Sequence, residues 1–318
     1  MEKRYLSGIQ PSGDLHLGNY FGAIRQHIAA QENAFYFIAN YHALTTVNDA
    51  RLLREQTLQA AATYLALGLD PDRATLFLQS DVPEVTELTW LLATTTSKGL
   101  LDRAVSYKDK VAKGITPGVG LYLYPVLMAA DILIYESDVV PVGSDQVQHV
   151  EMCRDMAASF NACYGEVFKL PAYEIGTPVP VPGTDGQKMS KSYGNTIPLF
   201  ASRAELRQRV LGIVTDSLPL TAPKDPDRCT VFRLYRLVAS EEQAAEMAEK
   251  YRAGGYGYGS AKAALLERIE ETFDGPRKRY AALLARPEEV KKALRSGAAR
   301  ARRVAREVLE RAREACGL

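Results

Sequence analysis

The start of the chain combines a short strand, a glycine-bearing turn and the beginning of a helix. Residues 4–8 are typical of a strand, residues 10–14 have turn chemistry, and His16 opens a helical run that ends at Gln31. Unpaired N–H groups and the helix dipole at such a helix N-terminus favour an anion. Gly18 would let a ligand approach the backbone closely, and His16 could donate a hydrogen bond to a phosphate oxygen. The pattern therefore predicts an anion site at the first βα turn.

In the first half of the chain, apolar strand-like runs alternate with helical patterns. The runs, which suit buried parallel strands, cover residues 34–39, 74–79 and 139–143. The helical patterns cover residues 51–67, 85–95 and 121–135, followed by one from a cap at Asp145 to about Tyr164. Alternation of this kind predicts a doubly wound α/β domain whose site lies at the carboxyl ends of the strands.

Beyond Asn195 only helical patterns remain. They cover residues 202–212, 231–239, 241–251, 260–272 and 287–316, with a candidate break in the last one near Gly297. We therefore expect an α/β domain over residues 1–195 and a second, all-helical domain over residues 196–318. For the last helix, packing back on the first domain is an alternative to packing within the second.

The composition is that of an ordinary globular protein, with 318 residues, 47% hydrophobic and 24% charged. No apolar run approaches the ~20 residues of a membrane span, and the N-terminus lacks the pattern of a signal peptide. The 4 cysteines show no CxxC spacing, which favours free thiols in a reducing compartment. We expect a cytoplasmic protein without a membrane partner.

Basic residues outnumber acidic ones from residue 276 onward, although the net charge of the chain is only +1. A basic face suits the phosphate backbone of a nucleic acid. The alternative is a solvated helix face whose arginines lie over apolar surface, and the sequence does not decide between the two.

A second candidate phosphate-binding segment is Lys188-Met189-Ser190-Lys191-Ser192, which follows a Gly/Pro-rich run. The run indicates a loop, and lysine is a compact charge with rotatable donors that suit a triphosphate. A lone lysine pair is more often solvated surface. This string, however, matches the KMSKS loop of class I aminoacyl-tRNA synthetases without a mismatch, and His16-Leu17-Gly18-Asn19 resembles their HIGH signature in an HxGN form.

Asp131 is the one carboxylate in the apolar helical run of residues 127–135. A buried acid without a partner is costly, so Asp131 requires a donor from the protein or from a ligand. An indole N–H only donates, so a carboxylate that accepts complements it, and an analogue without this donor would be rejected strongly. The alternative is a structural role, with Asp131 bound to a backbone amide or an arginine.

Further motifs extend along nearly the whole chain. They are QPSG at 10–13, HALT at 42–45, LMAADIL at 127–133, PVGSDQ at 141–146, VTDS at 214–217 and GYG at 257–259. Jointly with HxGN and KMSKS they resemble the bacterial-type tryptophanyl-tRNA synthetases. Three residues depart from that pattern: Leu6 replaces an aromatic residue, Tyr41 a glutamine and Ser144 an acid.

The resemblance implies an enzyme with a Rossmann-like doubly wound parallel sheet and a helical anticodon-binding domain. It would activate L-tryptophan with ATP, with Mg²⁺ carried by the nucleotide. It would then transfer tryptophan from the adenylate to the 3′ end of tRNA(Trp), so that pyrophosphate and AMP are released. A homodimer is expected as well.

The resemblance also assigns roles to residues at the matching positions. The catalytic candidates, which would act on the phosphates, are His16, Lys110, Lys188 and Lys191. Residues expected around ATP are Gln10, Pro11, Ser12, Gly18, Asn19, Gly143, Ser144, Asp145, Val179, Met189, Ser190 and Ser192. Residues expected around tryptophan are Leu6, His42, Tyr124, Met128, Asp131, Val140, Val142 and Gln146. A surface role remains an equal alternative for Lys110, His149 is expected to be structural, and His27 is assigned no role.

Three alternative functions remain open. A tyrosyl-tRNA synthetase shares fold and chemistry, but its pocket usually pairs an aspartate with a tyrosine for the phenol. A nucleotidyltransferase acting on a small cofactor precursor should lack both KMSKS and the basic helical domain. A non-catalytic paralogue should have lost His16, Lys188 or Lys191, and all three are present.

Overall fold

The computed structural model describes most of the chain. It covers residues 3–11, 13–104, 118–143, 146–175 and 181–318. Five residues expected at the site lie outside these described ranges: Ser12, Lys110, Ser144, Asp145 and Val179.

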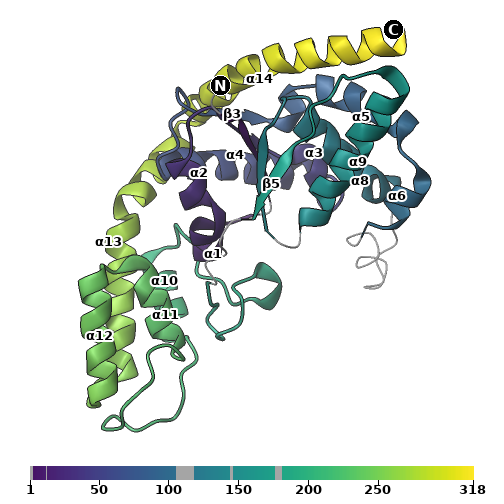
Figure 1. Ribbon diagram of the computed structural model, residues 1–318. Coiled ribbons are helices and arrows are strands. Elements are labelled where there is room, and N and C mark those ends of the chain that lie inside the picture. The colour runs from purple at the N-terminus through teal and green to yellow at the C-terminus, as the bar shows by residue number, and fades with distance from the viewer. Residues whose placement is uncertain (1–2, 12, 105–117, 144–145, 176–180) are drawn as a thin grey trace.

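A five-stranded parallel sheet with strand order β3-β2-β1-β4-β5 forms the centre of the first part of the molecule (Figure 1). The strands are β1 (Tyr5–Ile9), β2 (Ala34–Ile38), β3 (Thr75–Leu78), β4 (Val139–Val142) and β5 (Ala172–Ile175). Tyr5 of β1 pairs with Ala34 on one side and Val139 on the other. After β1 the chain adds β2 and β3 on one side of β1, and it then adds β4 and β5 on the other side. Such a reversal opens a crevice at the carboxyl ends of β1 and β4.

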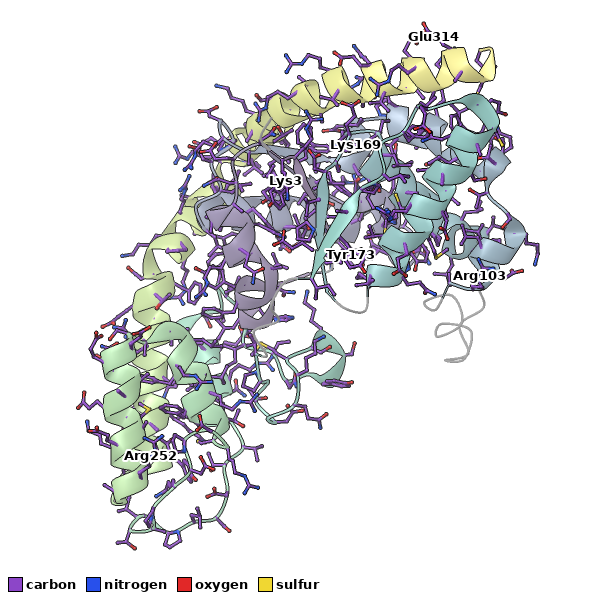
Figure 2. All side chains as sticks on the ribbon, in the orientation of Figure 1. Lys3, Arg103, Lys169, Tyr173, Arg252 and Glu314 are labelled. Carbon is purple, nitrogen blue, oxygen red and sulfur yellow. The ribbon has the colours of Figure 1, made fainter. Side chains whose placement is uncertain are left out.

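Strand β5 was not predicted from the sequence. All four of its residues are exposed, and it forms the edge of the sheet, where Tyr173 is seen at the surface (Figure 2). Strand patterns come from burial of one or both faces, so an exposed edge strand of four residues carries little pattern.

Helices cover both faces of the sheet and form all the regular structure that is described after Asn195 (Figure 1). In the first part they are α1 (Leu17–Asn19), α2 (Arg25–Ala29), α3 (Asn40–Ala43), α4 (Ala50–Ala66), α5 (Glu84–Thr95), α6 (Lys98–Asp102), α8 (Val119–Leu133) and α9 (Val147–Tyr164). Short turns are the π-helical η1 (Tyr20–Ile24) and the 3₁₀ turns η2 (Gln79–Asp81) and η4 (Lys191–Tyr193). The second part has α10 (Arg203–Leu211), α11 (Thr230–Val238), α12 (Glu241–Ala253), α13 (Tyr258–Ala285) and α14 (Pro287–Cys316).

The predicted helices correspond to these elements, with two differences in the last pair. Helix α13 continues through Pro276 well past the predicted end at residue 272. Helix α14 is unbroken, so the candidate break at Gly297 is wrong. A Cβ placed on Gly297 would lie 1.8 Å from the carbonyl oxygen of Leu76 in β3. The glycine is there because the backbone of α14 lies directly against the sheet.

Helix α14 returns from the helical region to the sheet, where it packs against β3, α4 and α5 (Figure 1). Its arginines take part in this packing. Arg300 donates to the carbonyl oxygens of Pro71 (2.6 Å) and Ala74 (3.0 Å). Buried Glu84 accepts from Arg302 at 2.8 Å and from Arg306 at 3.0 Å. These basic residues therefore attach α14 to α5 and to the segment before β3, so this part of the basic segment packs within the protein.

Three apolar clusters form the interior. One lies between the sheet and α5, α8, α9 and α14, and another lies on the opposite face under α2 and α4. The third joins the helical region to the first βα turn, because Leu17 and Phe21 pack with Met189 and with residues of α10, α11 and α13. None of the described helices is both long and apolar enough to cross a membrane.

The contact at Gly297 gives a stability prediction. Gly297→Ala forces α14 away from β3, so the free energy of unfolding should fall by roughly 1–3 kcal/mol. The measurement is urea-induced unfolding followed by circular dichroism. Gly275→Ala is the matched control, since Gly275 also lies inside a helix but has open space around its Cβ position. The control should be neutral or more stable by up to ~1 kcal/mol. Equal effects of the two changes would contradict the packing argument.

Candidate active site

Two adjoining cavities lie at the carboxyl ends of β1 and β4, where the strand order reverses. The first has a volume of about 450 Å³ and the second about 350 Å³. Residues 7–8, Gln10 and residues 141–143 line both of them. A ligand with two parts could therefore occupy both cavities and place its junction over β1 and β4.

The first cavity is lined by every residue that was expected around tryptophan. These residues are Leu6, His42, Tyr124, Met128, Asp131, Val140, Val142 and Gln146. Apolar side chains form most of the wall, so a flat apolar ring would be desolvated there. The Tyr124 hydroxyl lies 2.6 Å from His149 Nε2, so the histidine that was expected to be structural is the neighbour that orients Tyr124.

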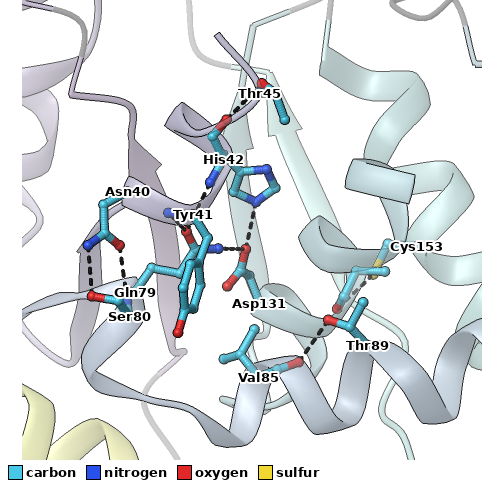
Figure 3. Close-up of polar contacts among 11 residues, drawn as sticks. Asn40, Tyr41, His42, Thr45, Gln79, Ser80, Val85, Thr89, Asp131 and Cys153 are labelled. Atoms are coloured by element: carbon cyan, nitrogen blue, oxygen red, sulfur yellow. Dashed lines mark hydrogen bonds and ion pairs between the residues drawn. The ribbon is translucent and has the colours of Figure 1, made fainter. Parts of the chain in front are cut away.

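Asp131 lies at the base of this cavity on α8, and its carboxylate is 1% exposed. Its Oδ2 atom accepts from Gln79 Nε2 at 2.7 Å and pairs with His42 Nε2 at 2.9 Å (Figure 3). Its Oδ1 atom is buried and has no hydrogen-bond partner among the residues that the structure describes. Among the described residues, the partners of Asp131 are these two side chains and not a backbone amide or an arginine. One acceptor atom therefore remains for a ligand.

Burial raises the pKa of the Asp131 carboxyl above its ordinary value, and the hydrogen bonds from His42 and Gln79 oppose that rise. Gln79 was not identified from the sequence, although it is fully buried. The one signal that could have found it is its position directly after the apolar run of β3, at the carboxyl end of a central strand.

The second cavity is bordered by the first βα turn. Gln10, Asn19 and Gly143 line it, as expected for a nucleotide site. His27 also lines it, although no role was predicted for this residue, and its Nδ1 lies 3.0 Å from the Tyr64 hydroxyl. Burial lowers the pKa of His27 to about 4, so its ring is neutral near pH 7.

His16 precedes α1, and its backbone N–H donates to Asn19 Oδ1 at 3.0 Å. The ring is buried, and its Nδ1 atom has no partner within the described part of the chain. Burial, followed by the charge of Lys191, lowers the pKa of His16 to about 4. A neutral ring with an unsatisfied nitrogen suits a hydrogen bond to a ligand oxygen.

Gly18 has a second reason to be glycine besides access for a ligand. A Cβ at this position would lie 2.9 Å from the His16 ring and 3.3 Å from Cβ of Met189. The Gly18 N–H donates to Met189 Sδ at 3.3 Å, so the KMSKS segment covers the start of α1. Lys191 is also close, since its Nζ lies 3.8 Å from the Cβ position of Gly13. The structure thus brings Met189 and Lys191 to the HxGN turn.

The remaining expected residues differ in their exposure. Lys188 and Ser192 are exposed, Ser190 is half-buried and Pro11 is buried. Burial lowers the pKa of Lys191, and the charge of Asp14 opposes that shift.

Asn195 determines the shape of the KMSKS segment, and no sequence motif pointed to this residue. Its Oδ1 accepts from the Ser190 N–H at 2.8 Å. Its Nδ2 donates to Asp185 Oδ1 at 2.8 Å and to the Lys188 carbonyl at 3.1 Å. Gly183 must be glycine here, because a Cβ would lie 2.2 Å from Asn195 Nδ2.

The buried histidine of the second cavity gives a pH prediction. The ordinary pKa of 6.5 applies to His27 in the unfolded chain, whereas the folded value is about 4. The unfolded state therefore binds the extra proton first, and folding stability falls as the pH drops from 6.5 towards 4. His27→Phe removes this protonation. Between these two pH values, the free energy of unfolding should therefore fall less in the variant than in the unaltered protein, by roughly 1–3 kcal/mol. Urea unfolding at several pH values measures it, and parallel pH profiles for the two proteins would contradict the buried neutral ring.

Comparison with known proteins extends the likeness beyond the signature motifs. The model of the family described as tRNA synthetases class I (W and Y) matches residues 2–274. The tryptophan–tRNA ligase of Rhodopirellula baltica is 56% identical over 318 residues and covers 99% of each chain. A crystal structure of tryptophanyl-tRNA synthetase from Campylobacter jejuni, complexed with ADP and tryptophane, superposes with a TM-score of 0.96. It is 48% identical and covers 99% of this chain and 100% of that chain.

These matches include the sheet and the helical region alike, and they confirm the family that the motifs predict. The two cavities at the strand ends, the HxGN turn and the covering KMSKS segment lie within the matched residues. The chain belongs to the class I tRNA synthetases for tryptophan and tyrosine, in the branch of the tryptophan–tRNA ligases.

Proposed function

We propose that this enzyme activates L-tryptophan with ATP and transfers it from the adenylate to tRNA(Trp). The observation that carries the proposal is the Oδ1 atom of Asp131, which has no hydrogen-bond partner within the described part of the chain and lies in an apolar cavity beside a second cavity at a helix N-terminus. An indole ring with its single N–H donor complements the first cavity, and a nucleotide complements the second. The names of the curated relatives support the same reaction.

The activation step requires no protein nucleophile. An oxygen of the tryptophan carboxylate attacks the α-phosphorus of ATP, the bond from that phosphorus to the bridging oxygen breaks, and pyrophosphate leaves with the electron pair. Negative charge grows on the leaving group, so correctly placed donors and cations lower the barrier. In the second step the 3′-terminal hydroxyl of the tRNA attacks the adenylate carbonyl, and AMP is released.

We assign the phosphates to the HxGN turn and the KMSKS segment. The unsatisfied nitrogen of His16 and the ammonium group of Lys191 are close to one another there, and Lys188 comes from the same segment. The Gly18 N–H would exchange Met189 Sδ for a ligand oxygen if the segment moved. We propose the same phosphate role for Lys110 and nucleotide roles for Ser12, Ser144, Asp145 and Val179 from their motifs alone.

Mg²⁺ is proposed to arrive bound to the nucleotide phosphates, where it would neutralise charge on the leaving group. The described residues contain no group of three or more His, Cys, Asp or Glu side chains placed to hold a metal ion.

We divide the chain into a catalytic domain, residues 1–195, and a helical domain, residues 196–318, that binds the anticodon region of the tRNA. Helices α13 and α14 of the second domain both pack on the first. The tip of the helical region carries Arg252 far from the sheet and is a suitable place for a distant part of the tRNA (Figure 2). Bases in an anticodon loop are unstacked and accessible to side chains.

A homodimer and a cytoplasmic location are part of the same proposal. Large apolar side chains are exposed near the N-terminal part of α8 and on α3 and α5, among them Leu44, Trp90, Val119 and Leu123. A hollow of about 570 Å³ lies between these elements. Exposed apolar patches of this kind mark surfaces that bind another protein, and we assign this one to a second copy of the chain.

The recognition role of Asp131 predicts the effect of Asp131→Asn. The change replaces an acceptor by an amide that must face two donors, so the KM for tryptophan in ATP–pyrophosphate exchange should rise roughly 10- to 100-fold. The KM for ATP should stay within about twofold, because the nucleotide cavity is separate. Exchange by the unaltered enzyme with tyrosine instead of tryptophan would mean that the pocket has been assigned to the wrong amino acid.

The phosphate role of Lys191 predicts a different kinetic effect. Lys191→Met should lower kcat of the exchange reaction about 100-fold or more, since its charge acts mainly on the developing pyrophosphate. The KM for tryptophan should change little. Lys292→Met is the matched control, because Lys292 is exposed on α14 away from both cavities. Similar losses in the two variants would remove the basis for the assignment.

A further inference from the structure

Gln79 lies directly after β3, in the turn η2, and its side chain is 0% exposed. It joins three elements that are distant in sequence: the end of β3, the start of α3 and the C-terminal end of α8 (Figure 3). Burial of an amide is costly unless its hydrogen bonds are satisfied. The contacts of Gln79 satisfy both ends of the amide, so its position is closely determined.

The orientation of the amide follows from chemistry. Its Oε1 atom accepts from the backbone N–H of Tyr41 at 3.0 Å, and that of His42 lies at 3.4 Å. A backbone N–H can only donate, so the oxygen must face α3 and the nitrogen must face α8. The Nε2 atom then donates to Asp131 Oδ2 at 2.7 Å. Reversal of the amide would place donor against donor on one side and oxygen against oxygen on the other.

This orientation has a consequence for Asp131. Gln79 Nε2 and His42 Nε2 converge on Oδ2, whereas Oδ1 has no hydrogen-bond partner among the described residues. Hydrogen bonds to the ionised form oppose the rise in the pKa of Asp131 that burial causes. The carboxylate is held by one oxygen and presents the other oxygen to the cavity. A group with one donor and no acceptor fits that position.

We propose that Gln79 is the positioning residue that makes Asp131 selective for the indole N–H. The inference rests on the proposed function, since it concerns how the same cavity recognises tryptophan. Gln79 acts through Asp131 and not by contact with the substrate. Without its donor, Asp131 loses its fixed orientation, and the cavity selects less strongly for a ring that carries an N–H.

His42 cannot supply this selectivity alone. Its ring is 16% exposed, and whether its Nε2 carries the proton depends on the tautomer. Gln79 is fully buried and always has its two donor hydrogens. It also holds the N–H groups at the start of α3, beside the reciprocal pair formed by Asn40 and Ser80. The position of His42 therefore depends on Gln79 as well.

The test uses two replacements that separate the donor from the shape of the side chain. Gln79→Met keeps the length and removes both polar ends. Gln79→Glu keeps an oxygen for the Tyr41 N–H and replaces only the donor nitrogen. Gln208→Met, at an exposed position on α10, is the matched control. Each purified full-length variant is compared in ATP–pyrophosphate exchange with L-tryptophan and with β-(3-benzothienyl)-L-alanine, whose ring has sulfur in place of the N–H.

Both Gln79 variants should raise the KM for tryptophan roughly tenfold, which corresponds to one hydrogen bond to a charged group. The KM for ATP should stay within about twofold of the unaltered enzyme. The preference for tryptophan over the benzothienyl analogue, taken as the ratio of kcat/KM values, should fall by about the same tenfold factor. The control should retain all three values.

An unchanged preference in either Gln79 variant would overturn the inference, because a merely structural role weakens both substrates equally. An effect confined to Gln79→Met would do the same, since it would point to packing and not to the donor. Thermal unfolding of each variant excludes loss of the folded state as the cause. If the unaltered enzyme shows no tryptophan-dependent exchange, the proposed function fails together with the inference; normal exchange with an unchanged preference overturns the inference alone.

Discussion

The site depends on a short antiparallel pairing between two parts of the chain that are far apart in sequence. The Leu17 N–H donates to the Ile197 carbonyl at 3.0 Å, and the Leu199 N–H donates to the Leu15 carbonyl at 3.0 Å. These bonds attach the segment after KMSKS to the first βα turn. Met189 can then reach Gly18, and Lys191 can reach His16. The proposed phosphate site therefore rests on backbone pairing, which places the side chains around it.

The two adjoining cavities differ in the titratable groups that surround them. Burial lowers the pKa of His27, which lines the second cavity, and of His16 at the adjoining turn, so neither ring supplies positive charge near pH 7. In the first cavity, the buried carboxyl group of Asp131 is bound by the side chains of Gln79 and His42 among apolar groups. For the proposed substrates, this difference in polarity sets the orientation of the bound pair.

The motifs and the central strands could be predicted because each is encoded by neighbouring residues. HxGN, KMSKS and the apolar strands are local strings, and Asp131 is conspicuous as an acid in an apolar helix. Gln79 and Asn195 belong to no sequence motif and were not identified, since they act on partners 52 and 10 positions away, namely Asp131 and Asp185. The basic C-terminal segment was ambiguous for the same reason, because Glu84, the partner of Arg302, comes from the first domain. Strand β5 is too exposed to show a pattern.

Helix α14 has a consequence for the synthesis of the protein. The sheet face beside β3 is completed by this 30-residue helix, with Gly297 against Leu76 and Arg302 on Glu84. A ribosome releases the chain from its N-terminus, so β3 and Glu84 emerge long before their cover does. Until α14 emerges, the apolar surface beside β3 and the carboxylate of Glu84 are exposed to water. Apolar surface exposed in this way makes a nascent chain prone to aggregation. Emergence of α14 from the ribosome is thus the event that allows the sheet face beside β3 to be covered.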